Sequence, residues 1–382
     1  MARAPADLTE DPVPEPDRVE GAPHPRETLR LIGQTAAEAA FMAAWRQGRM
    51  PHGWLLTGPR GVGKATLAWR IARFLLARPE EDGGLFAPPP PASLDIPPDH
   101  PVSRRMLALS EPRLFLLRRP WDDKATPPRH RQEITVDEVR RMKNFFSLSA
   151  ADGGRRVAIV DAADDLNTNA ANALLKLLEE PPRGVTLLLV SHQPWCLLPT
   201  IRSRCRELRL GPLSAPDLAQ ALAAAGVEVD GAGAMAELSG GSVGEAIRIA
   251  NLDGMKLYAQ LLALFATLPR IDRPRALALA EAGAGRGAEA SFDLILRLVD
   301  LFLARLARAG VTGAPPPEAA SGEAALIARL APDAAAALVW ADLAQGLLAR
   351  ARRGRAVNLD PASLLMDMVL KIDETAGTLA PR

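Results

Sequence analysis

The segment from Gly58 to Lys64 has the residues of a loop that binds the phosphate groups of a nucleotide. It fits the pattern G-x-x-x-x-G-K-[ST] at Gly58, Gly63 and Lys64, with a further glycine at Gly61. Glycines allow backbone N–H groups to wrap around phosphate oxygens, and the dipole of a following helix favours the same anion. Lys64 would neutralise oxygens of the β- and γ-phosphates. The segment therefore predicts a nucleotide site.

Two positions that ATP hydrolysis requires carry alanine. The Ser or Thr after the lysine normally binds Mg²⁺, but here it is Ala65, and Thr66 points about 100° further around the helix. An apolar run ending in Asp161 supplies an acidic residue for Mg²⁺, whereas the next residue is Ala162, which has no carboxylate to activate water. We expect the next acidic pair, Asp164-Asp165, to cap the following helix. Losses at two motifs predict a site that holds ATP or ADP at most, without hydrolysing it.

Strands that alternate with helices would position these groups. The apolar run 54–57 leads into the loop, and a helix with an apolar face over 67–75 follows it. Runs 156–160 and 186–190 predict two further buried strands, with a helix over 171–178 between them. Apolar strands that alternate with helices are typical of a parallel sheet covered by helices on both faces.

Composition divides the chain into four parts. Residues 1–26 contain six prolines and few apolar residues, which predicts a flexible arm. An α/β domain is expected over 27–212, with a proline-rich insertion at 79–130. Beyond it the strand pattern ends, so we expect a small helical lid at 213–252 and an all-helical C-terminal domain at 253–382.

The bulk composition limits the classes of function. Lys and Arg number 46 against 45 Asp and Glu, and this balance does not indicate tight autonomous binding to DNA. The two cysteines, Cys196 and Cys205, are too few for a disulfide framework or a four-cysteine zinc site, so we expect reduced thiols in the cytoplasm. No apolar run approaches the roughly 20 residues that span a bilayer, and no membrane partner is expected.

Four segments, in this order along the chain, resemble the AAA+ clamp-loader subunits of bacterial DNA polymerase III. They are Leu-Ile-Gly-Gln at 31–34, the helix and Pro-Pro stop at 172–182, Leu-Pro-Thr-Ile-Arg-Ser-Arg-Cys at 198–205 and Asn-Leu-Asp-Pro at 358–361. The tripeptide Ser-Arg-Cys alone is unspecific, but the ordered set is specific and spans roughly 26–372. The resemblance implies an AAA+ P-loop core, a lid and a helical collar that joins subunits.

The resemblance also implies roles for particular residues. Arg204 would be an arginine finger that reaches the γ-phosphate of ATP bound to a neighbouring subunit. Ser191 falls at the sensor-1 position beside the phosphates. Gly244 stands where active subunits carry a sensor-2 arginine, so a third contact with the γ-phosphate is missing. Many relatives carry a four-cysteine zinc module that 79–130 lacks, and no zinc is expected.

An arginine finger in a chain that lacks the residues for ATP hydrolysis fits the delta-prime type of subunit. Such a subunit is a stator in a five-subunit assembly with delta and gamma/tau, which loads the sliding clamp onto primed DNA during replication. It belongs to DNA-directed DNA polymerase III, a nucleotidyltransferase complex, and the resemblance implies that it has no ATPase activity of its own and requires no cofactor.

Three other interpretations stay open. An active gamma/tau-like motor would use Thr66 and an unusual base. A P-loop phosphotransferase for small molecules would give no reason for the segment 198–205. A purely structural scaffold would make Arg204 incidental. ATP turnover by the isolated chain, and replacement of Arg204 in the assembled loader, separate these interpretations.

Overall fold

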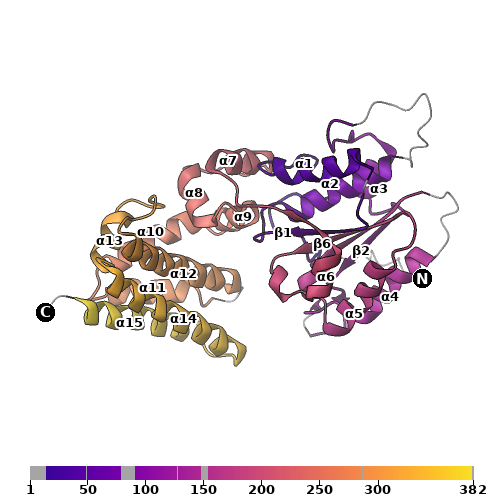
Figure 1. Ribbon diagram of the computed structural model, residues 1–382. Coiled ribbons are helices and arrows are strands. Elements are labelled where there is room, and N and C mark those ends of the chain that lie inside the picture. The colour runs from indigo at the N-terminus through magenta and orange to yellow at the C-terminus, as the bar shows by residue number, and fades with distance from the viewer. Residues whose placement is uncertain are drawn as a thin grey trace, which may run out of the picture. The chain divides into compact units, whose positions relative to one another are not determined.

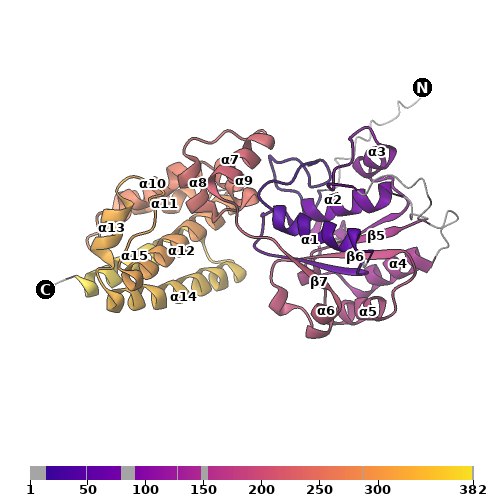
Figure 2. The same ribbon diagram turned by 45° about the horizontal axis from the view of Figure 1, so that its top comes forward.

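The computed structural model describes residues 14–48, 50–78, 91–126, 128–147, 154–285 and 287–380 (Figures 1 and 2). The chain folds into two compact units that divide between Pro212 and Leu213. The first unit combines a parallel sheet with helices, and the elements of the second unit are helices throughout its described residues. A P-loop α/β core followed by helices is the fold class that the sequence predicted.

A five-stranded parallel sheet forms the centre of the first unit, in the order β2-β5-β6-β1-β7. Its strands are β1 (Gly53–Thr57), β2 (Leu114–Arg118), β5 (Arg156–Asp161), β6 (Val185–Ser191) and β7 (Arg206–Arg209). A separate antiparallel pair consists of β3 (Trp121–Asp122) and β4 (Arg129–His130). The inner strands β1 and β6 are buried along their whole length, because helices cover both of their faces.

The helices of the first unit form two groups, one on each face of the sheet (Figures 1 and 2). One face carries α1 (Thr35–Arg46) and α2 (Lys64–Ala77), where the rings of Phe41 and Trp54 pack 5.0 Å apart. The opposite face carries α4 (Val136–Ser147), α5 (Thr168–Glu179) and α6 (Pro199–Arg204). The remaining helical elements are α3 (Pro101–Leu107), η1 (Ala163–Asp165) and η2 (Pro194–Cys196).

Part of the segment predicted as an insertion belongs to the core. Within 79–130, residues 79–90 and 127 lie outside the described residues, whereas β2 is a strand of the main sheet paired with β5. Prolines flank this strand and do not interrupt it, so its amides stay available to the ladder. The apolar run at 114–117 thus forms a strand of the sheet although it lies within the proline-rich segment.

Residues 14–26 are held against the α/β domain, although the sequence predicted a flexible arm there; the rest of that arm, 1–13, lies outside the described residues. The imidazole of His24 is fully buried, edge-on to an indole ring of α2, and its Nε2 lies 3.1 Å from Asp17 Oδ2. A guanidinium nitrogen of Arg73 donates to a backbone carbonyl of the segment at 2.6 Å. Composition could not reveal these contacts, because the partners on α2 are distant in sequence.

The second unit consists of helices. The predicted lid region contains α7 (Ala215–Ala224), α8 (Ala232–Ser239) and α9 (Val243–Asn251). The C-terminal region contains α10 (Gly254–Phe265), α11 (Arg273–Ala282), α12 (Glu289–Thr312), α13 (Glu323–Leu330), α14 (Ala334–Ala356) and α15 (Pro361–Leu379). No single helix of the described residues is long and apolar enough to cross a membrane, while α13 and α14, bent by 101°, satisfy length and composition only as a pair.

A buried ion-pair network joins the lid region to the C-terminal helices. Arg305 of α12 contacts Glu323 of α13 (Nε–Oε1, 2.6 Å) and Glu237 of α8 (Nη1–Oε2, 2.9 Å). The hydroxyl of Tyr258 donates to the same Glu323 oxygen at 2.6 Å. Glu323 is 1% exposed and Arg305 is 6% exposed, so each charge depends on the other for compensation. The two helical regions therefore share one packed unit.

Replacing Arg305 with Met should strongly destabilise this unit. The substitution leaves the Glu323 carboxylate buried without a cation, which typically costs about 3–5 kcal/mol. Urea denaturation followed by circular dichroism measures the change. Arg308→Met, on the exposed side of the same helix, is the control and should change stability by less than about 0.5 kcal/mol. Equal stability of the two variants would mean that Glu323 finds another partner.

Candidate functional site

The phosphate loop lies between β1 and α2, and its glycines are required by backbone conformation and by close contacts. Gly58 has a φ of 138°, and a Cβ there would lie 2.2 Å from the carbonyl oxygen of Leu210. Gly63 has a φ of 99°, and a Cβ there would lie 2.6 Å from the Leu31 side chain. Gly61 also has a positive φ, 75°. Residues with side chains would adopt this loop only with strain.

Lys64 is directed at its own loop. Its side chain is buried, and Nζ donates to the carbonyl of Gly58 at 2.7 Å and to that of Pro59. Burial lowers the pKa of the Lys64 amine to about 8, and the carboxylates of Asp161 and Asp164 act against this shift. The ammonium group thus already donates to backbone carbonyl oxygens, which take the place of the phosphate oxygens of a bound nucleotide.

Parallel strands end together at one edge of the sheet, and β5 and β6 bring Asp161 and Ser191 to that edge, next to the loop after β1. Burial raises the pKa of the Asp161 carboxyl from its ordinary value of 3.8 to about 7. The carboxylate of Asp17 adds to this rise, and Lys64 opposes it. Asp161 is therefore partly protonated near pH 7 in the chain by itself, and it would have to release this proton to bind a cation.

The positions that lack catalytic side chains are distributed over both units. Ala65 lies in the first turn of α2, and Ala162 follows β5 with 4% of its surface exposed. Neither methyl group can bind a metal ion or activate water. Thr66 is half-buried in the same turn of α2, and Gly244 lies in α9 of the second unit. Among the described residues, no group of three or more His, Cys, Asp or Glu side chains is arranged to hold a metal ion.

Asp164 contacts the end of β6, so the prediction that it caps the next helix is wrong. Its Oδ1 accepts from the Ser191 hydroxyl at 2.7 Å, and its Oδ2 accepts from the N–H of His192 at 2.5 Å. The cap of α5 is Asn167, whose side chain accepts from the N–H of Ala170 at 3.0 Å. The hydroxyl of Ser191, the predicted sensor-1 residue, is thus directed at Asp164. No local pattern could reveal this pair, because its members lie 27 positions apart in the sequence.

Asp17 is a further carboxylate that sequence reasoning missed, and it lies beside Asp161. Arg118 ends β2 and is paired in register with Asp161 of β5. Its Nη1 lies 2.9 Å from Asp17 Oδ1 and 3.4 Å from Glu15 Oε1. The N-terminal segment thus brings negative charge to the sheet edge that would also receive negative phosphates. No short motif marks Asp17, since its partner on β2 follows 101 positions later.

Arg204, the predicted finger, is the last residue of α6 and is held by α5. Its Nη2 lies 2.8 Å from Glu179 Oε1, and Nη1 donates to the carbonyl of Thr200 at 3.1 Å. The Arg204 side chain is 37% exposed, while the fully buried Ile201 fixes the helix in the core. The guanidinium group therefore lies at the surface on a rigid base, where a second anion could replace the Glu179 carboxylate.

The strand order, the glycine loop after β1 and the acidic residue at the end of β5 define an AAA+-type P-loop domain. A family model described as DNA polymerase III, delta subunit, matches residues 33–214. Over this region the chain is similar to clamp-loader subunits of DNA polymerase III, delta' among them, which agrees with the resemblance of its motifs.

The individual relatives include both delta' and gamma subunits. The DNA polymerase III subunit delta' of Pseudomonas aeruginosa is 39% identical over 169 residues, which cover 43% of this chain and 45% of that protein. The delta' subunit of Escherichia coli is 30% identical over 172 residues, covering 45% and 46%. The gamma subunit of Buchnera aphidicola is 27% identical over 194 residues, covering 51% and 47%. The chain thus spans just under half the length of each of these relatives.

Asp161→Asn should stabilise the chain at pH 8 more than at pH 4. Between pH 3.8 and about 7 the folded chain keeps a proton on Asp161 that the unfolded chain releases, so the wild type loses stability as pH rises through this window. Asn has no such proton, and the stability difference should grow by about 2–4 kcal/mol from pH 4 to pH 8. Chemical denaturation of both proteins at the two pH values measures it. A constant difference would mean that folded Asp161 is ionised throughout.

Proposed function

We propose that this chain is the delta-prime-type subunit of a bacterial clamp loader, the part of DNA polymerase III that places the sliding clamp on primed DNA. It would work in the cytoplasm as a stator, joined to delta and gamma/tau subunits through its C-terminal helices. The observation that carries the proposal is a contrast within the first unit. Arg204 is exposed on a helix fixed in the core, whereas the chain's own phosphate loop is followed by Ala65 and lacks a Mg²⁺ ligand there.

Arg204 has the chemistry that a neighbouring ATP site would need. Transfer of the γ-phosphoryl group spreads negative charge over its oxygens, and a fixed cation stabilises that transition state. A guanidinium group stays protonated and can donate two parallel hydrogen bonds to an anion. In the free chain Glu179 accepts one such bond at 2.8 Å. Engagement would exchange this single carboxylate for a phosphate of higher charge.

The chain's own nucleotide site would not turn over ATP. Ala65 and Ala162 remove the Mg²⁺ ligand and the water-activating carboxylate. Phosphate groups would also have to displace the carbonyl contacts of Lys64 and approach the carboxylate of Asp17. ATP or ADP would therefore be held, at most, without hydrolysis, and the proposed function needs no bound zinc.

An active gamma/tau-like motor is the second candidate, because gamma and gamma/tau subunits also appear among the relatives, at 27% and 29% identity. The isolated chain should hydrolyse Mg²⁺-ATP no faster than its Lys64→Ala variant, since the loop lacks the metal ligand. Phosphate release by the two purified proteins measures this. Turnover that Lys64→Ala abolishes would favour the motor.

Arg204→Ala should lower ATP-dependent clamp loading at least tenfold without preventing assembly. An arginine finger contributes roughly a thousandfold or more at the ATP site that it serves. The chain is reconstituted with delta and gamma/tau, and assembly is followed by size-exclusion chromatography beside loading on primed DNA. Arg183→Ala, another exposed arginine of the first unit, is the matched control. Unchanged loading by Arg204→Ala would point to a purely structural scaffold.

A further inference from the structure

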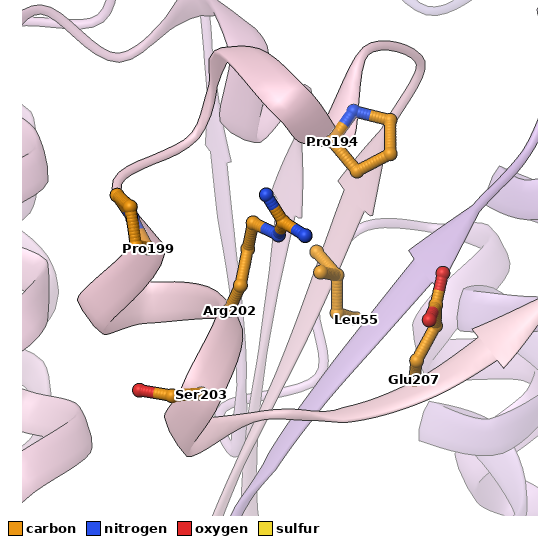
Figure 3. A pocket seen from close by; sticks show the side chains of 6 residues that line it. All are labelled: Leu55, Pro194, Pro199, Arg202, Ser203 and Glu207. Carbon is orange, nitrogen blue, oxygen red and sulfur yellow. The ribbon is translucent and has the colours of Figure 1, made fainter.

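A pocket of about 390 Å³ opens beside α6, on the face of the sheet that this helix covers. Figure 3 shows the guanidinium group of Arg202 extending from α6 toward Pro194 and Leu55. Leu55, Pro194 and Pro199 give the pocket an apolar wall. The full lining consists of Leu55, Pro194, Pro199, Arg202, Ser203 and Glu207.

Arg202 forms no ion pair with the described residues that line the pocket. The Glu207 carboxylate lies across from it, beyond ion-pair distance, and accepts a hydrogen bond from the Thr57 hydroxyl at 2.6 Å. Among the residues that the structure describes, no carboxylate lies within ion-pair distance of Arg202. Arg204 differs in this respect, since it has Glu179 as a partner. The pocket therefore presents a guanidinium without an ion-pair partner in the described part of the chain at one side of an apolar wall, and the Glu207 carboxylate, held by Thr57, at the other.

The two arginines of α6 project in different directions. They are two positions apart, so their side chains leave the helix about 200° apart. Arg202 is directed into the pocket, and Arg204 is directed at Glu179 at the end of α5. Because Ile201 fixes the helix in the core, a contact made by Arg202 also determines where Arg204 lies relative to the contacting molecule.

We infer that this pocket receives an aspartate or glutamate side chain of the neighbouring motor subunit and that Arg202 anchors it. The inference rests on the proposed function, because the occupant belongs to the subunit whose ATP Arg204 would reach. A carboxylate satisfies the free guanidinium, and the methylene groups behind it suit the wall of Leu55 and the two prolines. Trp195, adjacent to Pro194, is 71% exposed, and Trp and Arg are the residues that contribute most at protein interfaces.

Arg202 and Arg204 would thus have separate tasks on one helix. Arg202 binds the partner and places the helix, and Arg204 acts on the phosphate. Loss of the anchor should weaken association, while ATP turnover recovers once the partner is supplied in excess. Loss of the finger should lower turnover at every concentration.

The test measures the affinity of the full chain for the gamma/tau subunit of the same organism by titration calorimetry, without nucleotide. Arg202→Glu should weaken binding at least tenfold, and Arg202→Lys, which keeps the charge, should weaken it less than about threefold. Arg183→Glu, an exposed charge reversal elsewhere in the first unit, is the matched control. Excess Arg202→Glu chain should restore the ATPase rate of the assembly to within about twofold of wild type.

Wild-type affinity of Arg202→Glu would overturn the inference. So would a variant that binds gamma/tau normally but loses affinity for primed DNA, since the pocket would then serve nucleic acid. If the thermal unfolding midpoint of Arg202→Glu falls, Trp195→Ala replaces it and should weaken binding at least fivefold. Failure of the wild-type chain to bind gamma/tau would instead reject the proposed function itself.

Discussion

The site depends on one constraint at the carboxyl edge of the parallel sheet. Charged side chains lie close together there, and each buried charge needs a hydrogen bond or an opposite charge from its neighbours. Lys64 is compensated by carbonyls of its own loop, and Asp164 by hydroxyl and N–H groups at the end of β6. Asp17 is compensated by Arg118. Asp161 is the exception, and burial raises its pKa to about 7. The edge is thus largely satisfied from within, and a nucleotide would have to replace contacts that already exist.

The sheet could be predicted because each of its strands is recognisable from a short stretch of neighbouring residues. The strands β1 and β5 are apolar runs next to a glycine loop or an aspartate, so their type and order follow from short stretches of sequence. The contacts of the site are not local. Asp164 looks like a helix cap because a helix follows it closely, yet its partner Ser191 is 27 positions away. Asp17 lies in a proline-rich segment whose composition predicts no fixed structure. Other residues of the segment contact α2, and Asp17 itself pairs with Arg118 of β2.

The second unit depends on one desolvated guanidinium group. Arg305 joins α8 of the lid region to α12 and α13 of the C-terminal region through two carboxylates. Helices tied in this way cannot shift independently without exposing or isolating a buried charge. Such coupling would suit a stator, in which the lid region and the C-terminal helices keep one arrangement while neighbouring subunits change theirs. The sequence suggested two separate helical domains because the polar partners, Glu237 and Glu323, are far from Arg305 along the chain.

The ion pair between Glu179 and Arg204 means that another anion can bind the exposed guanidinium only by displacing the Glu179 carboxylate. A ligand gains this cation only if its attraction exceeds that of a carboxylate already 2.8 Å away and held on the same domain. Single carboxylates on passing proteins offer no advantage over Glu179, whereas a terminal phosphate carries more charge and more acceptor oxygens. The pair would therefore act as an intrinsic competitor, which discriminates between anions by their charge and keeps the arginine from unselective contacts before assembly.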